Sequence, residues 1–311
     1  MAAACAYPPE GVLLAHATPD ALRRAAFLDG REAFADATCT VPEGVFVAAG
    51  VAWPKTPLPV ILHVSFCGST LLARMLDVPG RTIVYREPAF QIALADRHAA
   101  GEPVEALLLP STAAFARPVA GATAIVKPTN WANALLPVWA EARAIRPAFV
   151  TMAPHAFLTA VFRGGRERIS FTLRVAEHLA RVTEGGPTLI ASAAGSSTAP
   201  LERAAALVIA ALALQCRFFA DARRRLGCGN GCVVDAAEVF ADLRAAALRV
   251  AAALGIADLT PASAETRHAK GGAAHSTERE RAANTAVQLG NRDTFARALR
   301  WAEIERLSFA V

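Results

Sequence analysis

The apolar residues of the chain gather in five short runs, each with the length and β-branched content of a buried strand. These runs cover residues 60–64, 82–85, 123–126, 147–152 and 232–235. Between them lie longer segments in which apolar residues recur every three or four positions, as they do on the buried face of a helix. Strands that alternate with helices predict an α/β fold, with a mostly parallel central sheet and helices on both faces.

The spacing of these runs also predicts how the chain is divided. Residues 1–56 precede the first run and are expected to form a small N-terminal extension, whereas residues 57–311 are expected to form one α/β domain. Within that domain, residues 166–227 have helical periodicity only, so we expect a helical insertion between the fourth and fifth strands. A chain of 311 residues is long enough to bury a sizeable core.

Individual residues predict several local features. Thr18 and Pro19 are expected at the N-cap and first position of a short helix, and Asn130 is expected to cap the helix that follows it. Val45–Val47 are expected to form a strand. The stretch 103–118 contains three prolines and is expected to be irregular, which would suit a lid over a substrate.

The composition excludes several classes of protein. Hydrophobic residues make up 54% of the chain and charged residues 19%, which is typical of a globular protein and not of a disordered one. The net charge of +5 suits small anionic ligands, but the basic residues are too scattered to indicate a nucleic-acid-binding protein. Only three of the 32 basic residues are lysines, Lys55, Lys127 and Lys270, so each is a candidate functional residue.

Neither a metal centre nor a membrane anchor is indicated. Cys228 and Cys232 are four positions apart, but no second pair of cysteines or histidines completes a zinc site. The longest apolar run, residues 204–214, is too short to cross a bilayer, and the N-terminus lacks the basic start and apolar stretch of a secretory signal. We therefore expect a cytoplasmic protein with reduced thiols and no bound metal.

The first apolar run leads into the stretch with the strongest functional pattern. A strand is followed by the short polar turn Ser65–Thr70 and then by leucines and a methionine at helical spacing. In this layout the backbone N–H groups at the helix N-terminus converge and can bind an anion. Gly68 allows close approach to a ligand, and the hydroxyls of Ser69 and Thr70 can cap the helix or bind an oxyanion. An ordinary strand–turn–helix corner has the same pattern, so a phosphate- or sulfate-binding loop is one of two interpretations.

The loop does not match the Walker A pattern of kinases and ATPases, because no glycine lies five positions before Gly68 and no lysine follows it. It resembles instead the 5′-phosphosulfate loop of the sulfotransferase superfamily, whose P-loop-like pattern is a strand, a basic residue, Ser-Gly-Ser/Thr-Thr and a leucine-rich helix. Residues 68–72, Gly-Ser-Thr-Leu-Leu, match the second half of this pattern. Phe66 stands where the family has Arg or Lys, and Cys67 where it has Ser. The resemblance extends over about residues 57–275.

This resemblance implies a set of donor-binding residues. The donor would be 3′-phosphoadenosine-5′-phosphosulfate (PAPS), with its phosphosulfate held by the amides and hydroxyls of the loop. The strand end at Pro154 resembles the family's 3′-phosphate segment, in which Met152 replaces an arginine, Thr159 takes the place of a serine, and Arg163 is a substitute cation. A late basic, glycine-containing stretch resembles the loop that these enzymes fold over the 3′-phosphate and adenine. The implied donor-binding residues are Ser65, Phe66, Cys67, Gly68, Ser69, Thr70, Leu71, Thr159, Arg163, Arg267, Lys270 and Gly271.

Two further residues are implied to act on the transferring group. Glu87 follows the second predicted strand and Lys127 the third, and in an open α/β sheet the carboxyl ends of the strands face the ligand. By the resemblance, Glu87 would be the base that deprotonates the acceptor, so Glu87→Gln should remove most turnover without disturbing the fold. Lys127 would supply the cation that Phe66 cannot, and Arg86 would offset charge on the transferring group. A solvated ion pair and a surface lysine are the alternative interpretations.

The resemblance implies transfer of a sulfuryl group from PAPS to a hydroxyl or amine, by in-line displacement and without a metal. The acceptor would be a small molecule or a peptide, and no nucleic acid or membrane partner is expected. A nucleotide-dependent kinase is an alternative, because Asp235 at the end of the last strand could be a magnesium ligand. A non-catalytic nucleotide-binding relative is another, because Phe66 and Met152 both replace expected cations.

Overall fold

The computed structural model describes residues 2–6, 11–31, 35–53, 55–229, 232–262 and 277–311. Within these residues, the centre of the fold is a five-stranded parallel sheet with the strand order β5-β6-β4-β7-β8. Its strands are β4 (Leu58–His63), β5 (Thr82–Arg86), β6 (Thr123–Lys127), β7 (Ile145–Thr151) and β8 (Val233–Asp235). All five predicted strands are confirmed, each to within two residues at either end, because almost every residue in them is buried.

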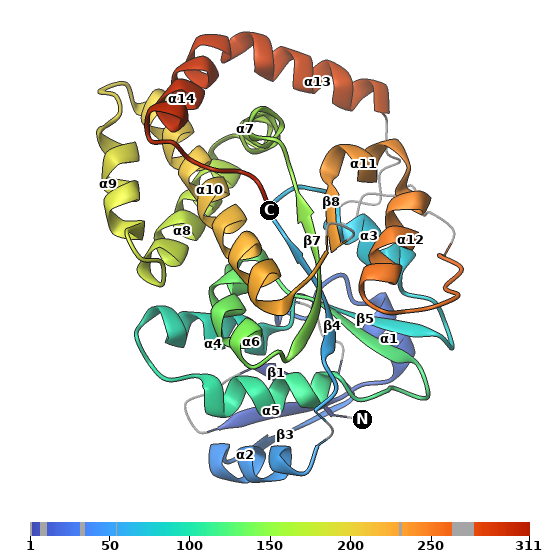
Figure 1. The fold of residues 1–311 in the computed structure, drawn as a ribbon. Coiled ribbons are helices and arrows are strands. Elements are labelled where there is room, and N and C mark those ends of the chain that lie inside the picture. Colours follow the sequence, from blue (N-terminus) through green and yellow to red (C-terminus); the bar gives the residue numbers. More distant parts are fainter. Residues whose placement is uncertain (1, 7–10, 32–34, 54, 230–231, 263–276) are drawn as a thin grey trace.

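Helices cover both faces of this sheet, as Figure 1 shows. One face carries α3 (Ser69–Met75), which packs on β4 and β5, and α12 (Leu243–Ala253), which packs on β7 and β8. The other face carries α5 (Glu105–Phe115), the 3₁₀ helix η1 (Asn130–Leu135) and α6 (Leu136–Glu141). The predicted α/β class, with helices on both faces of a parallel sheet, is therefore confirmed.

The strand order determines where a ligand would bind. From β4 in the middle of the sheet, the chain passes to β5 at one edge, returns to β6 beside β4, and then crosses to β7 on the other side. The winding of the sheet thus reverses at β4. In open α/β sheets, ligands bind outside the carboxyl ends of the strands at such a reversal, which is where the loop after β4 lies.

The chain after β7 is mostly helical, as predicted. Its helices are α7 (Pro154–Arg163), α8 (Gly165–Arg181), α9 (Gly186–Gly195), α10 (Pro200–Leu226), α11 (Ala236–Ala241), α13 (Thr277–Gly290) and α14 (Arg292–Ile304). In the described part of the chain, α10 is the one helix long and apolar enough to cross a membrane, but 72% of its most apolar stretch is buried inside the fold. It packs against α8, α9 and α14, so its apolar surface belongs to the core.

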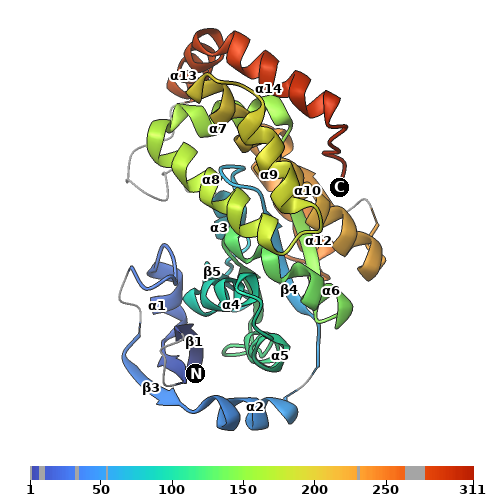
Figure 2. The same ribbon diagram turned by 90° about the vertical axis from the view of Figure 1, so that its left-hand side faces the viewer.

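The N-terminal extension forms a small antiparallel sheet and two helices. The elements are β1 (Ala2–Ala6), β2 (Val12–His16), α1 (Pro19–Arg24), β3 (Ala37–Val41) and α2 (Glu43–Val51). The predicted start of α1 is confirmed, because the Thr18 hydroxyl accepts a hydrogen bond from the Ala21 N–H at 3.2 Å. Figure 2 shows these elements at the opposite end of the molecule from α13 and α14. Of them, α1 packs on β5 and β1 packs on α4 (Ala89–Ala99).

Two predicted elements are wrong. Val45–Val47 lie in helix α2, where Phe46 and Gly50, one turn apart, are buried against the rest of the protein. A Cβ on Gly50 would overlap the Cβ of Pro110, so the glycine allows α2 to pack closely on α5. The stretch 103–118 is not an irregular lid, because most of it is α5, which contains Pro110 and contributes buried residues to the core.

Candidate functional site

The loop after β4 has the backbone geometry of an anion-binding turn. Phe66 and Gly68 adopt left-handed conformations, with φ angles of 62° and 84°, and Gly68 is the N-cap residue of α3. Within the described part of the chain, the N–H groups of Phe66, Gly68 and Thr70 donate to no backbone or side-chain acceptor. Alternation of left-handed and other conformations turns successive N–H groups toward one concave side, where an anion can bind.

Two groups of this loop already have partners within the protein. The Cys67 thiol is fully buried and accepts hydrogen bonds from the N–H and hydroxyl of Ser69, and burial raises the pKa of the thiol. The Leu71 N–H donates to the Gly68 carbonyl oxygen at 2.9 Å, so it is already part of the helix. The structure therefore leaves the amides of residues 66, 68 and 70 and the Thr70 hydroxyl for a ligand.

A buried polar network holds the base of the loop. Asn130 donates to the Ser65 Oγ at 2.7 Å and to the Gln215 Oε1 at 3.2 Å, so it does not cap a helix as predicted. Asn133 donates to the His63 carbonyl oxygen at 3.2 Å. Asn130, Asn133 and Gln215 are almost completely buried. Buried amides that bond one another fix their own rotamers and hence the position of the loop.

His63, at the end of β4, lies directly beneath the loop. Its two ring nitrogens are each 2.9 Å from a carbonyl oxygen, those of Val64 and Pro128, so a neutral ring can donate to only one of them. Burial, followed by the positive charge of Lys127, lowers the pKa of His63 to about 4. Glu87 and the two carbonyl contacts oppose this shift, but only in part. His63 is therefore neutral at physiological pH.

Glu87 and Lys127 meet at the carboxyl ends of β5 and β6. The strands pair Arg86 with Lys127, and the Glu87 N–H donates to the Lys127 carbonyl oxygen at 2.7 Å. The Lys127 Nζ lies 2.5 Å from the Glu87 Oε1. Burial alone would raise the pKa of Glu87, but the charge and hydrogen bond of Lys127 outweigh it and lower that pKa. The predicted proximity of the two side chains to each other is observed, and Glu87 is ionised at neutral pH.

The two partners differ in exposure, and this limits their roles. The Lys127 side chain is 1% exposed and that of Glu87 is 17% exposed. The charge of Lys127 also opposes the rise in the pKa of the Cys67 thiol. In this conformation Lys127 can affect a ligand through Glu87 and through its charge, whereas Glu87 can contact a ligand directly.

A segment of the N-terminal extension covers this ion pair. The Leu28 N–H donates to the Arg86 carbonyl oxygen and the Ala89 N–H donates to the Leu28 carbonyl oxygen, at 2.7 and 2.9 Å. These bonds flank Glu87, whose φ of 56° is unusual for a residue other than glycine. The Phe27 ring centroid lies 5.9 Å from the Lys127 Nζ. The extension is thus part of the site, which the sequence did not indicate.

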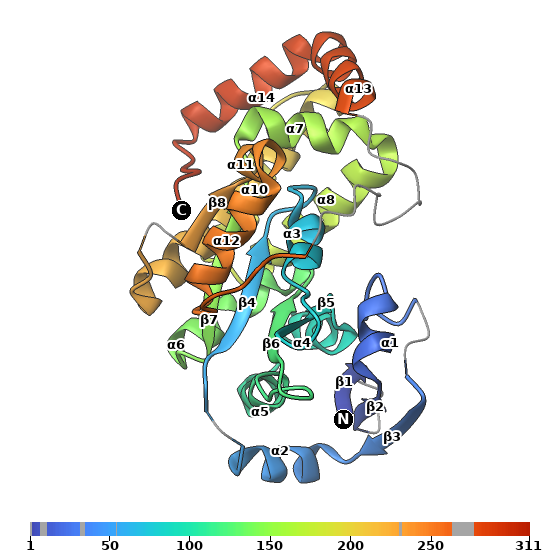
Figure 3. The same cartoon turned by 90° about the vertical axis from the view of Figure 1, so that its right-hand side faces the viewer.

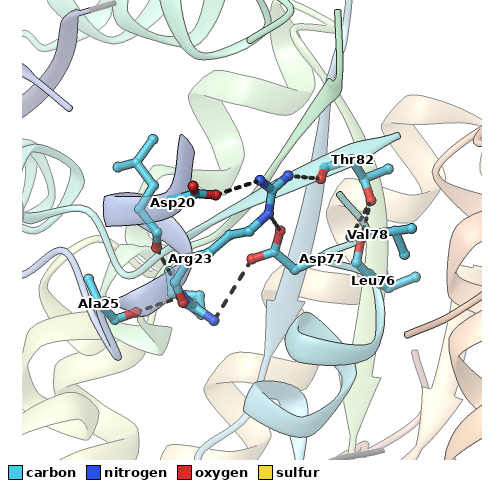
Figure 4. Close-up of polar contacts among 9 residues, drawn as sticks. Asp20, Arg23, Ala25, Leu76, Asp77, Val78 and Thr82 are labelled. Atoms are coloured by element: carbon cyan, nitrogen blue, oxygen red, sulfur yellow. Dashed lines mark hydrogen bonds and ion pairs between the residues drawn. The ribbon is translucent and has the colours of Figure 1, made fainter. Parts of the chain in front are cut away.

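Arg86 does not face the loop as expected. It donates to the carbonyl oxygens of Leu22, Arg23 and Ala25 at 3.0, 2.7 and 2.6 Å, so it caps the last turn of α1. Figure 4 shows the surrounding network, in which Arg23 bonds the Asp77 carboxylate and the Thr82 carbonyl oxygen. Figure 3 shows α1 and α3 on the side of the sheet where these residues meet, and a groove of about 460 Å³ lies between them. Arg86 therefore joins the extension to the sheet.

The Phe66 ring packs against two residues of α8. It lies edge-on to Phe171, with ring centroids 6.4 Å apart, and the Arg168 Cζ lies 4.5 Å from its centroid. Arg168 was not a candidate from the sequence, because it lies a hundred residues after the loop and no local motif marks it. The structure thus places a cation beside Phe66, and that cation comes from α8 and not from the loop.

Two of the residues predicted to bind the 3′-phosphate, Thr159 and Arg163, lie in the described part of the chain. Thr159 is buried, donates to the His155 carbonyl oxygen at 2.9 Å and accepts from Gln288 at 3.3 Å, so its hydroxyl is already bonded. Arg163 donates to the Asn284 Oδ1 at 3.0 Å. The three remaining predicted residues, Arg267, Lys270 and Gly271, lie outside the described residues.

The carboxylate of Asp235 is occupied by a structural role. It accepts a hydrogen bond from the Ala237 N–H at 2.7 Å, and Glu238 bonds the Asp235 N–H in return at 3.1 Å, which together form a capping box for α11. Among the described residues, no group of three or more His, Cys, Asp or Glu side chains could hold a metal ion. Asp235 therefore shows no feature of a magnesium ligand in this conformation.

Comparison with known proteins adds no family: no protein-family model, no curated protein and no solved structure matches the chain significantly. The fold alone therefore defines the class. The chain is an α/β protein with a five-stranded parallel sheet and a loop of unpaired amides where the winding of the sheet reverses.

Proposed function

We propose that the protein is a cytoplasmic sulfotransferase that moves a sulfuryl group from PAPS to a hydroxyl or amine of a small-molecule or peptide acceptor. The observation that supports this most is the loop after β4, whose amides are unpaired at the reversal of the sheet, with the ionised Glu87 after β5 at the same edge of the sheet. The resemblance of residues 68–72 to the phosphosulfate loop of sulfotransferases supports PAPS as the donor.

In the proposed reaction the acceptor oxygen or nitrogen attacks the sulfur in line with the bond that breaks. The bond between the sulfur and the phosphate oxygen is cleaved, and the product nucleotide 3′-phosphoadenosine-5′-phosphate (PAP) leaves with the electron pair. The acceptor proton passes to the Glu87 carboxylate, which is ionised and partly exposed. The amides of residues 66, 68 and 70 stabilise the negative charge on the transferring group.

The test is a calorimetric titration with PAP and, separately, with ATP and Mg²⁺. We expect PAP to bind and ATP to bind more weakly, because the loop has no lysine for the terminal phosphates of ATP. Thr70→Val should weaken PAP binding about tenfold, through loss of one hydrogen bond to a charged group. Thr38→Val, the same change at an exposed residue of β3, is the control and should leave binding unchanged.

Tighter binding of ATP than of PAP would favour a kinase instead. Binding of PAP without labelling of any acceptor from ³⁵S-PAPS, in a screen of hydroxyl and amine compounds, would favour a non-catalytic nucleotide-binding protein.

A further inference from the structure

Arg168 is held beside the loop by three separate contacts. Its guanidinium stacks on the Phe66 ring, with the Cζ 4.5 Å from the ring centroid. Its Nη1 donates to the Ala160 carbonyl oxygen in α7 at 2.8 Å. Its stem lies over Gly164, where a Cβ would overlap the Cγ, Cδ and Nε of Arg168. A long, flexible side chain is thus fixed in one position by an aromatic ring, a carbonyl oxygen and a glycine.

Arg168 forms no ion pair with a carboxylate of the described residues. In the described part of the chain, neither Arg168 nor Arg163 has an acidic side chain within ion-pair distance, and Arg163 donates a hydrogen bond to the neutral side chain of Asn284. The two arginines are close enough to interact. Burial, followed by the charge of Arg163, lowers the pKa of Arg168, and Glu167 and Glu280 oppose the shift.

Burial and the charge of Arg163 both disfavour the charged form of Arg168, Glu167 and Glu280 offset this only in part, and a bound anion would favour the charged form. Arg168 touches the ring of Phe66, whose own N–H is one of the unpaired amides of the loop. The cation and the amides can therefore act on one ligand.

We propose that Arg168, held in place by Gly164 and the Phe66 ring, is the principal cation for a phosphate- or sulfate-bearing ligand at the loop, with Arg163 as the second cation. The aromatic residue at position 66 then supports an arginine from α8 in place of a basic residue in the loop. This inference rests on the proposed function only in taking the loop as an oxyanion site, and it assigns to residues of α7 and α8 the direct contact with the ligand that the buried Lys127 cannot make.

Gly164 allows a test that keeps the charge of Arg168. Its φ of −85° is accessible to alanine, so Gly164→Ala should leave the backbone undisturbed and displace the arginine side chain. Arg168→Gln removes the charge, and Arg166→Gln removes an exposed charge two residues away on the same helix as a control. Urea unfolding of each variant checks that the fold is retained.

The four proteins, wild type included, are titrated with PAP and with inorganic pyrophosphate. We expect Arg168→Gln to weaken binding about ten- to a hundredfold, since a charge-assisted hydrogen bond is lost. Gly164→Ala should weaken binding less, and Arg166→Gln should change it less than twofold. The dependence of affinity on salt should also be shallower for Arg168→Gln than for wild type.

Equal affinities of wild type and Arg168→Gln for a probe that binds would overturn the inference. The same holds if Arg166→Gln weakens binding as much as Arg168→Gln, because the effect would then be one of general charge. If wild type binds pyrophosphate but not PAP, and Arg168→Gln does not bind pyrophosphate, that result would support the role of Arg168 and contradict PAPS as the donor. If wild type binds neither probe, both proposals fail.

Discussion

Removing the carboxylate of Glu87 should destabilise the whole fold, because it leaves the Lys127 ammonium buried without a counter-charge. Lys127 is 1% exposed, and breaking a buried ion pair by removing one partner costs about 3–5 kcal/mol. We therefore expect Glu87→Gln to lower the free energy of unfolding by about 3 kcal/mol, contrary to the expectation from sequence that this variant leaves the fold undisturbed.

Lys127→Met should cost less, about 1 kcal/mol, because methionine fills the space of the lysine stem and the Glu87 carboxylate, 17% exposed, can be hydrated. The double variant should resemble Lys127→Met, so the coupling between the two positions should be about 3 kcal/mol. The exposed pair of Arg97 and Glu102 is the control, and Glu102→Gln should cost less than about 1 kcal/mol.

The assay is urea unfolding at pH 7 followed by circular dichroism, with the change in midpoint multiplied by the slope m. Costs that add in the double variant, or a cost for Glu87→Gln no larger than for Glu102→Gln, would show that the pair is hydrated and not buried.

Three further predictions concern the supports of the site and of the extension. His63 takes up a proton near pH 6.5 in the unfolded chain and near pH 4 in the folded protein. The free energy of unfolding should therefore be highest above pH 6.5 and fall by about 3 kcal/mol by pH 4, and His63→Gln should weaken this pH dependence in urea unfolding. Asn130→Ala should cost about 1–3 kcal/mol and weaken PAP binding, because the loop serine loses its donor. Gly50→Ala should lower the melting temperature because its Cβ overlaps Pro110, whereas Gly44→Ala, in open space on the same helix, should not.

The strands and the loop were predictable because their signals are local. An apolar run of four to six residues is enough to indicate a strand buried on both faces, and the parallel order then brings the residues after β5 and β6 to one edge. The meeting of Glu87 and Lys127 at one edge of the sheet follows from these positions, whereas their proposed roles come from the family resemblance. The predictions for residues 45–47 and 103–118 were wrong because both stretches form helices that are stabilised by packing. The close approach of Gly50 in α2 to Pro110 in α5 is part of that packing.

The rest of the site depends on contacts between distant parts of the chain. Arg168 reaches Phe66 from α8, Asn130 reaches Ser65 from η1, and Leu28 brackets Glu87 from the extension. None of these contacts has a pattern in the sequence near either partner. Only the packing of the helices against the sheet brings them together.

The most direct test of the account is a crystal structure of the protein soaked with PAP. The account predicts density for the 5′-phosphate within hydrogen-bonding distance of the N–H groups of residues 66, 68 and 70, with the Arg168 guanidinium on the same phosphate. A nucleotide bound elsewhere, for example in the arginine-lined groove between α1 and α3, would contradict it.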